Sequence, residues 1–146
     1  MPTAADLLKM TQQELDDLFK TSPPGPIPDG EAKGTAIIAP GTTFSPAIAE
    51  FINVFGWQGK TFDGKHGTLV NRILTPGFQA IIAEVYVDKS WLDGKDCIVL
   101  DYSKTSLVAH WIRDEIRLIG ENFYLGKVYW DKKRLIDFCL DFSKTR

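Results

Sequence analysis

Cysteine is scarce in this chain. Its 146 residues include only Cys97 and Cys139, and both lie in segments rich in the β-branched and aromatic residues that favour strands. A thiol in such a segment usually behaves as a small buried hydrophobe, and a chain of this length buries about 70% of its unfolded surface without disulfide bonds. We therefore expect free thiols in a reducing compartment, most simply the cytoplasm, with a bridged or reactive pair as the alternative.

Long apolar runs and an excess of one charge are also absent. No run approaches the roughly 20 residues that a membrane-spanning helix needs, and the N-terminal residues have neither the basic start nor the apolar core of a secretory signal. The formal net charge is −2, with acidic and basic residues interspersed. Such a chain has no field that attracts phosphate backbones. These absences favour a protein without a membrane span and without a nucleic-acid partner.

The signatures of common metal and cofactor sites are missing as well. The two histidines and the two distant cysteines offer no metal-ligand spacing. Neither the glycine-rich loops that hold nucleotides nor the nucleophile elbow of hydrolases occurs in the chain. We therefore predict no metal site and no cofactor.

What the sequence has in abundance is strand pattern. Segments rich in β-branched and aromatic residues follow one another, and their connections in the last third of the chain are too short for anything but antiparallel pairing. We predict a mainly β (α+β) fold of about eight antiparallel strands, either an up-and-down barrel or a strongly curved sheet. The predicted strands are Glu31–Pro40, Trp57–Phe62, Thr68–Leu74, Gly77–Val87, Asp96–Tyr102, Trp111–Ile119, Phe123–Trp130 and Arg134–Phe142.

Two helices and a stiff connector accompany these strands. Thr11 and Glu14 have the spacing of a capping box, which predicts a helix to about Lys20 that lies against the domain or, alternatively, binds a partner. Residues 22–30 are rich in proline and predict an extended connector. Ser45–Pro46 begins a second helix, which Gly56 ends and which could plug one end of a barrel. We therefore expect one domain over residues 1–146, with a helical segment at 1–21, the connector at 22–30 and the barrel at 31–142.

Strand alternation predicts which side chains face the interior. In the last strand, Ile136, Phe138, Leu140 and Phe142 share one apolar face. In the strand that begins at Trp111, an aspartate shares the apolar face. The residues of that face are Ile112, Asp114, Ile116 and Leu118.

A carboxylate on an apolar face needs a partner, because its burial otherwise costs several kcal/mol. The candidate partners of Asp114 are Arg72, His110, Lys104 and the hydroxyls of Tyr102 and Tyr124. The same question arises for Asp101, which shares a strand face with Val99, although the opposite face is equally apolar. Either aspartate could simply tie strands together. Alternatively, one or both could join His110 and a tyrosine to orient a ligand or to transfer a proton.

The segment Phe55–Phe62 (FGWQGKTF), preceded by the second predicted helix and followed by hairpins, resembles small calycin-type barrels. These are the lipocalin-like and fatty-acid-binding-like proteins, in particular the bacterial ones marked by Gly-x-Trp-x-Gly. Trp57-Gln58-Gly59 fits this motif, whereas Gly56 lies one position too close to the tryptophan. Asp114–Arg117 and Tyr124–Lys127 are similar in style to the closing strands of such barrels. The resemblance implies that Trp57 packs across the closed end and that the barrel has a cavity for an apolar ligand.

Three functional hypotheses follow from these patterns. The first is a barrel that binds a hydrophobic small molecule, such as a lipid or an acyl chain. The second is an enzyme in which Asp114 or Asp101 is the base, Tyr102 or Tyr124 is the donor, and His110 belongs to the polar cluster. The third is a structural module, or a homodimer, with a filled core. The predicted ligand-binding residues are Arg72, Val99, Tyr102, Ile112, Asp114, Ile116, Leu118, Tyr124, Phe138 and Leu140.

Overall fold

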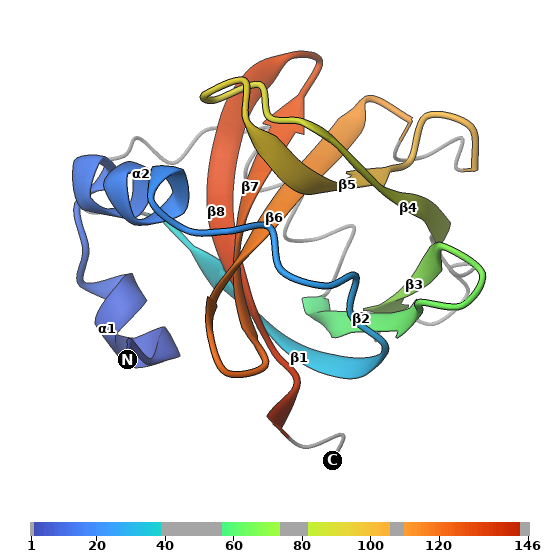
Figure 1. Cartoon of the computed structure of the whole chain (residues 1–146), viewed down its shortest axis with the longest axis horizontal. Helices are drawn as coiled ribbons and strands as arrows, with labels where there is room; N and C mark the ends of the chain where they lie inside the picture. Colours follow the sequence, from blue (N-terminus) through green and yellow to red (C-terminus); the bar gives the residue numbers. More distant parts are fainter. Residues whose placement is uncertain (1, 39–56, 74–81, 106–109, 144–146) are drawn as a thin grey trace.

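The computed structural model describes residues 2–38, 57–73, 82–105 and 110–143. Within them, eight strands form a closed barrel in which each strand pairs antiparallel with the next one along the chain and β8 pairs with β1 (Figure 1). This confirms the mainly β fold and selects the barrel over the curved sheet. The strands are β1 (Gly30–Ile37), β2 (Trp57–Asp63), β3 (Thr68–Ile73), β4 (Ile82–Lys89), β5 (Asp96–Asp101), β6 (Ile112–Gly120), β7 (Phe123–Trp130) and β8 (Lys133–Asp141).

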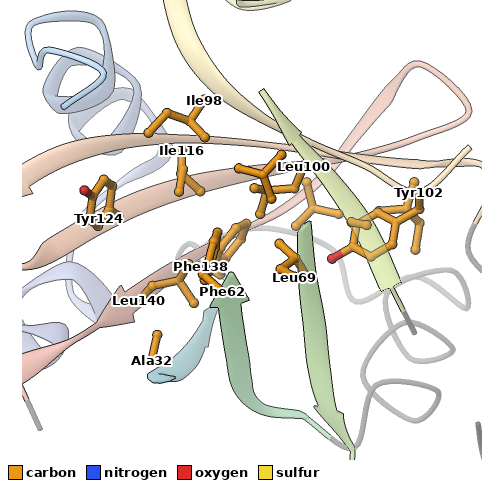
Figure 2. Packing of buried hydrophobic residues seen from close by; sticks show 14 of the residues in the cluster. Ala32, Phe62, Leu69, Ile98, Leu100, Tyr102, Ile116, Tyr124, Phe138 and Leu140 are labelled. Atoms are coloured by element: carbon orange, nitrogen blue, oxygen red, sulfur yellow. The ribbon is translucent and has the colours of Figure 1, made fainter. Parts of the chain in front are cut away.

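Alternating side chains of these strands fill the barrel with a packed apolar cluster. Figure 2 shows Phe62, Leu100, Ile116 and Phe138 meeting there from four different strands. Gly126 of β7 makes this packing possible, because a Cβ atom at that position would collide with the ring of Phe138. The alternation predicted for β6 and β8 is confirmed. Members of the cluster include Ile112, Ile116, Ile136, Phe138, Leu140 and Phe142, with Leu118 packed against it.

Two short helices, α1 (Ala4–Leu8) and α2 (Gln12–Lys20), lie against the outer wall of the barrel (Figure 1). The predicted capping box between Thr11 and Glu14 begins α2. Together with Leu7 of α1, Leu15 and Phe19 of α2 form an outer cluster against the wall. This cluster also contains Ile37, Cys97, Val99, Phe123, Leu125 and Cys139. Among the described residues, neither helix has the length and apolar character needed to cross a membrane.

Buried charges fasten α2 to the wall. Arg117 donates from Nη1 to the backbone oxygen of Phe19 at 3.0 Å and to Asp93 at 2.7 Å. Lys127 donates to Asp137 at 2.6 Å and to Asp16 of α2 at 2.8 Å. These charges are paired across helix and strand, so their role in the structure is to hold the N-terminal segment in place.

The proline-rich connector closes one end of the barrel. Leu118 donates its N–H to the oxygen of Pro23 at 3.0 Å, and the Tyr124 hydroxyl donates to the oxygen of Pro26 at 2.7 Å. Farther along, Asp29 accepts from the N–H of Gly64 at 2.8 Å. The connector therefore crosses from the end of β6 to the turn between β2 and β3. At the opposite end of the barrel, β1, β3 and β5 end and β2, β4 and β6 begin.

Two of the expectations from the sequence lie outside the described residues. They are the second helix, predicted from Ser45–Pro46 to Gly56, and the packing of the Trp57 side chain. The backbone of Trp57 is described, as the first residue of β2.

Candidate functional site

A lysine, a tyrosine and an aspartate meet inside the barrel. Lys60 Nζ lies 2.7 Å from the Tyr102 hydroxyl and 3.3 Å from Asp114 Oδ2. The Tyr102 hydroxyl also lies 3.3 Å from Asp114 Oδ2. The side chains of Lys60 and Asp114 are 1% and 2% exposed, and Tyr102 is fully buried. We call these three residues the interior polar cluster.

Three strands bring the members of the interior polar cluster together. Lys60 follows a bulge in β2 and points to the same side of the strand as Phe62. Gly59 permits this bulge, because a Cβ atom there would collide with the carbonyl oxygen of Ala32. Asp114 lies on β6 opposite Leu100 of β5. The cluster is thus fixed by backbone pairing rather than by a surface loop.

Tyr102 follows the last residue of β5, at the end of the barrel away from the proline-rich connector. Figure 2 shows it at one side of the apolar cluster, with Tyr124 at the other side. Because Tyr124 contacts the connector, the two tyrosines mark opposite ends of the interior. The interior polar cluster therefore faces the end from which the connector is absent.

The apolar surroundings shift both ionisable groups of the ion pair toward their neutral forms. Burial lowers the pKa of the Lys60 ammonium, although its attraction to Asp114 opposes this shift. Burial likewise raises the pKa of the Asp114 carboxyl, against the attraction and hydrogen bond of Lys60. Close to Lys60 Nζ lies an apolar ring, that of Phe138, whose centroid is 5.7 Å away.

Asp114 has one oxygen that the cluster does not use. Oδ2 interacts with both Lys60 and Tyr102, whereas Oδ1 is buried and has no hydrogen-bond partner among the described residues. Such an atom costs about 1–3 kcal/mol relative to a satisfied one. Chemically, the cluster offers an amine, a hydroxyl and a carboxyl group whose Oδ1 accepts no hydrogen bond from the part of the chain that the structure describes.

The structure confirms two expectations about where side chains lie. Asp114 does face the interior, and Tyr102 is one of its partners as predicted. The side chain of Arg72 lies outside the described part of the structure. Lys104, another candidate partner, is exposed. Whether the apolar residues of the interior contact a ligand stays a prediction.

Two residues that were predicted to face the interior lie on the outer side of the barrel wall. Val99 belongs to the outer cluster under the N-terminal helices, so the expectation that it lines the interior is wrong. Asp101 also faces outward, where it accepts from the Tyr86 hydroxyl at 2.7 Å and from Ser103. The reason is that α1 and α2 bury the outer face of β5 as completely as the core buries its inner face.

Two further candidates lie away from Asp114. The Tyr124 hydroxyl donates to the connector at the closed end. The His110 ring stacks near Trp111, with centroids 4.3 Å apart, and lines a surface cavity of about 270 Å³ together with Trp91, Arg113 and Lys132. These contacts lie outside the interior polar cluster, and the catalytic roles of Tyr124 and His110 stay predictions.

Lys60 is the member that sequence reasoning missed. It lies within the predicted strand Trp57–Phe62, and the alternation of side chains along this strand already indicates its direction. Lys60 and Phe62 are two residues apart and thus share a strand face, so an inward Phe62 implies an inward Lys60.

Comparisons with known proteins give the fold and no more. No family model matches the sequence, and no curated protein matches it. Among solved structures, the chain is similar to the crystal structure of a protein from Thermomonospora curvata, with 17% identity over 91% of this chain and 88% of that one and a TM-score of 0.64. At this identity the likeness supports the barrel alone. The calycin or lipocalin type suggested by the sequence stays a prediction.

Proposed function

We propose that the barrel binds a small apolar molecule that carries a hydrogen-bond donor, and that the interior polar cluster holds this donor. The observation that carries the proposal is Asp114 Oδ1, a buried acceptor without a partner among the described residues. A ligand hydroxyl, amide or amine placed there would supply the missing hydrogen bond. The apolar side chains around the cluster would receive the rest of the molecule.

The energetics of the cluster support a functional role. Replacement of a buried ion pair by apolar residues of similar size is often neutral or stabilising, so a pair in the middle of an apolar core is not there to stabilise the fold. The core around Lys60 and Asp114 consists of aliphatic and aromatic side chains that could have filled their places. Departures of this kind from a consistent core are expected at functional sites.

The packing restricts where the ligand lies. Leu118, Leu140 and Tyr124 belong to the half of the barrel that the connector closes, and Leu118 packs directly against Gly25 of the connector. The half that contains Tyr102, Asp114 and Ile112 faces the opposite end. We therefore retain Tyr102, Ile112, Asp114 and Phe138 as ligand contacts and assign the closed half to the core.

Two matched probes test the proposal. Octanol has a donor, whereas methyl octyl ether has a similar apolar body and only acceptors. Because one hydrogen bond contributes about 1 kcal/mol, calorimetric titration should give an affinity for octanol roughly five- to tenfold above that for the ether. Native mass spectrometry of protein purified from its own host should, in addition, reveal a retained apolar ligand.

A second buried lysine–aspartate pair provides the control. The variant K60M/D114L should lose the preference for octanol because it removes the free acceptor. The variant K127M/D137L removes a pair of comparable burial on the outer wall and should keep the preference. Equal affinities of the wild-type protein for alcohol and ether, or binding of neither, would contradict the proposal.

The compartment and the partners belong to the same proposal. Both cysteines are free and buried, which supports a reducing compartment such as the cytoplasm. A homodimer stays a prediction. Its first test would be at Val70 and Ile82, an exposed apolar pair on neighbouring strands β3 and β4.

A further inference from the structure

Lys60 has the surroundings of a nucleophilic amine. A lysine amine reacts with carbonyl groups only when it is unprotonated, and burial in an apolar site is a common way to achieve this. Lys60 is 1% exposed, and its Nζ atom lies 5.4 Å from the centroid of the Tyr102 ring and 5.7 Å from that of the Phe138 ring. The amine also lies next to a phenol and a carboxyl group. Each of the groups that imine formation requires is therefore within hydrogen-bond or ion-pair distance of the others.

Lys127 shows what a merely structural lysine looks like in the same protein. It is as buried as Lys60, but two carboxylates, Asp137 and Asp16, lie within 2.8 Å of its Nζ atom. A neighbouring guanidinium, that of Arg134, also bonds to Asp16. Lys127 thus belongs to a network of side chains that ties α2 to the barrel wall. At Lys60, the Asp114 carboxylate lies at the longer distance of 3.3 Å.

We propose that Lys60 captures an apolar aldehyde as an imine in the barrel interior, an assignment that rests on the ligand site proposed above. A proton of the Lys60 ammonium first passes to Asp114, its partner in the ion pair, which leaves a neutral amine and a protonated carboxyl group. The neutral Nζ then adds to the carbonyl carbon, and one of its protons passes to the oxygen to give a carbinolamine. The protonated Asp114 then gives its proton to the hydroxyl group, which leaves as water while the nitrogen lone pair forms the C=N bond. The remaining proton on nitrogen returns to Asp114. Amine and aldehyde thus yield imine and water, with no oxidant or reductant.

The three residues have distinct roles in this step. Lys60 is the nucleophile, and Asp114 is the acid and then the base. Tyr102, whose hydroxyl contacts both of the other groups, positions the amine and can relay the proton. An aldehyde fits better than a ketone, because its carbonyl carbon bears only one substituent and the interior is densely packed. The apolar walls select a hydrocarbon substituent over a charged one.

The reaction can be trapped. Octanal is added to the wild-type protein with cyanoborohydride, which reduces an imine to a stable secondary amine. We expect an early product that carries one octyl group, which peptide mapping places on Lys60. This measurement on the wild-type protein needs no variant, so it does not depend on the folding of a mutant. K60M/D114L should lose this product, and K127M/D137L should form it as the wild-type protein does.

The outcomes separate the inference from the proposed function. Octanol binding with an octyl group on Lys60 supports both. Octanol binding with octyl groups only on exposed lysines such as Lys65 and Lys104 overturns the imine and leaves the binding site intact. Absence of both octanol binding and a Lys60 adduct overturns both.

Discussion

The interior ion pair makes a quantitative prediction about stability. Lys60 and Asp114 are almost completely buried and 3.3 Å apart. At an effective dielectric constant of about 20, their attraction is about 5 kcal/mol. The variants K60M and D114L each remove this attraction and leave the other residue as a buried ionisable group. Because the remaining group can become neutral, we expect each single variant to lose about 3–5 kcal/mol of unfolding free energy rather than more.

The double variant K60M/D114L distinguishes the stabilisation that comes from pairing the two groups from the cost of burying them. It removes both polar groups at once and fills their places with apolar side chains of similar size, so the desolvation cost disappears together with the attraction. The Tyr102 hydroxyl loses two of its interactions, which offsets part of this gain. We therefore expect the double variant to lie within about 2 kcal/mol of the wild-type protein.

Urea denaturation of the four proteins gives the free energies and shows whether the slope with denaturant is unchanged. The account requires a coupling energy of about 4 kcal/mol or more between the two sites. Additive losses in the double variant, or single variants as stable as the wild-type protein, would refute the reasoning that the pair is buried and coupled.

Three further predictions concern other parts of the barrel. G126A should lose about 1–3 kcal/mol in urea denaturation because the added methyl group meets the Phe138 ring, and G126A/F138L should recover part of this loss. Y102F should lose about 1–3 kcal/mol, whereas Y129F should be neutral or stabilising because the buried Tyr129 hydroxyl has no partner among the described residues. Arg117 holds the pKa of Asp93 at about 2, below its ordinary 3.8, so this pair contributes stability above about pH 4 that is lost as the pH falls toward 2. D93N should therefore be less stable than the wild-type protein at pH 6 and equal to it near pH 2, and a pH-independent difference would contradict the assignment.

Strand alternation predicted much of the barrel because most strands have one apolar and one polar face. On β6, Ile112 and Ile116 alternate with Arg113 and Arg117, and the structure places the two sets on opposite sides of the wall. The short connections of the last four strands left no choice but antiparallel neighbours. Closure of the barrel follows from the pairing of β1 with β8, which no local pattern in the sequence indicates.

Residues whose environment depends on distant segments were harder to predict. On β5, Ile98 and Val99 are both fully buried, one by the core and one by the N-terminal helices. Alternation is invisible in such a strand because both faces are apolar. The partner of Asp114 was missed for a related reason. Lys60 is 54 positions away in the sequence, and only the folded barrel brings β2 and β6 face to face across the interior.

The central claim is that the interior polar cluster is a ligand site. It is tested most directly by a crystal structure of the protein with a bromine-labelled octanol, because the anomalous signal of bromine locates the ligand independently of side-chain interpretation. The account predicts a molecule inside the barrel with its hydroxyl within hydrogen-bond distance of Asp114 Oδ1. A crystal with the alcohol bound only on the outer wall, or one in which apolar side chains occupy all the space beside Tyr102 and no alcohol is bound, would contradict it.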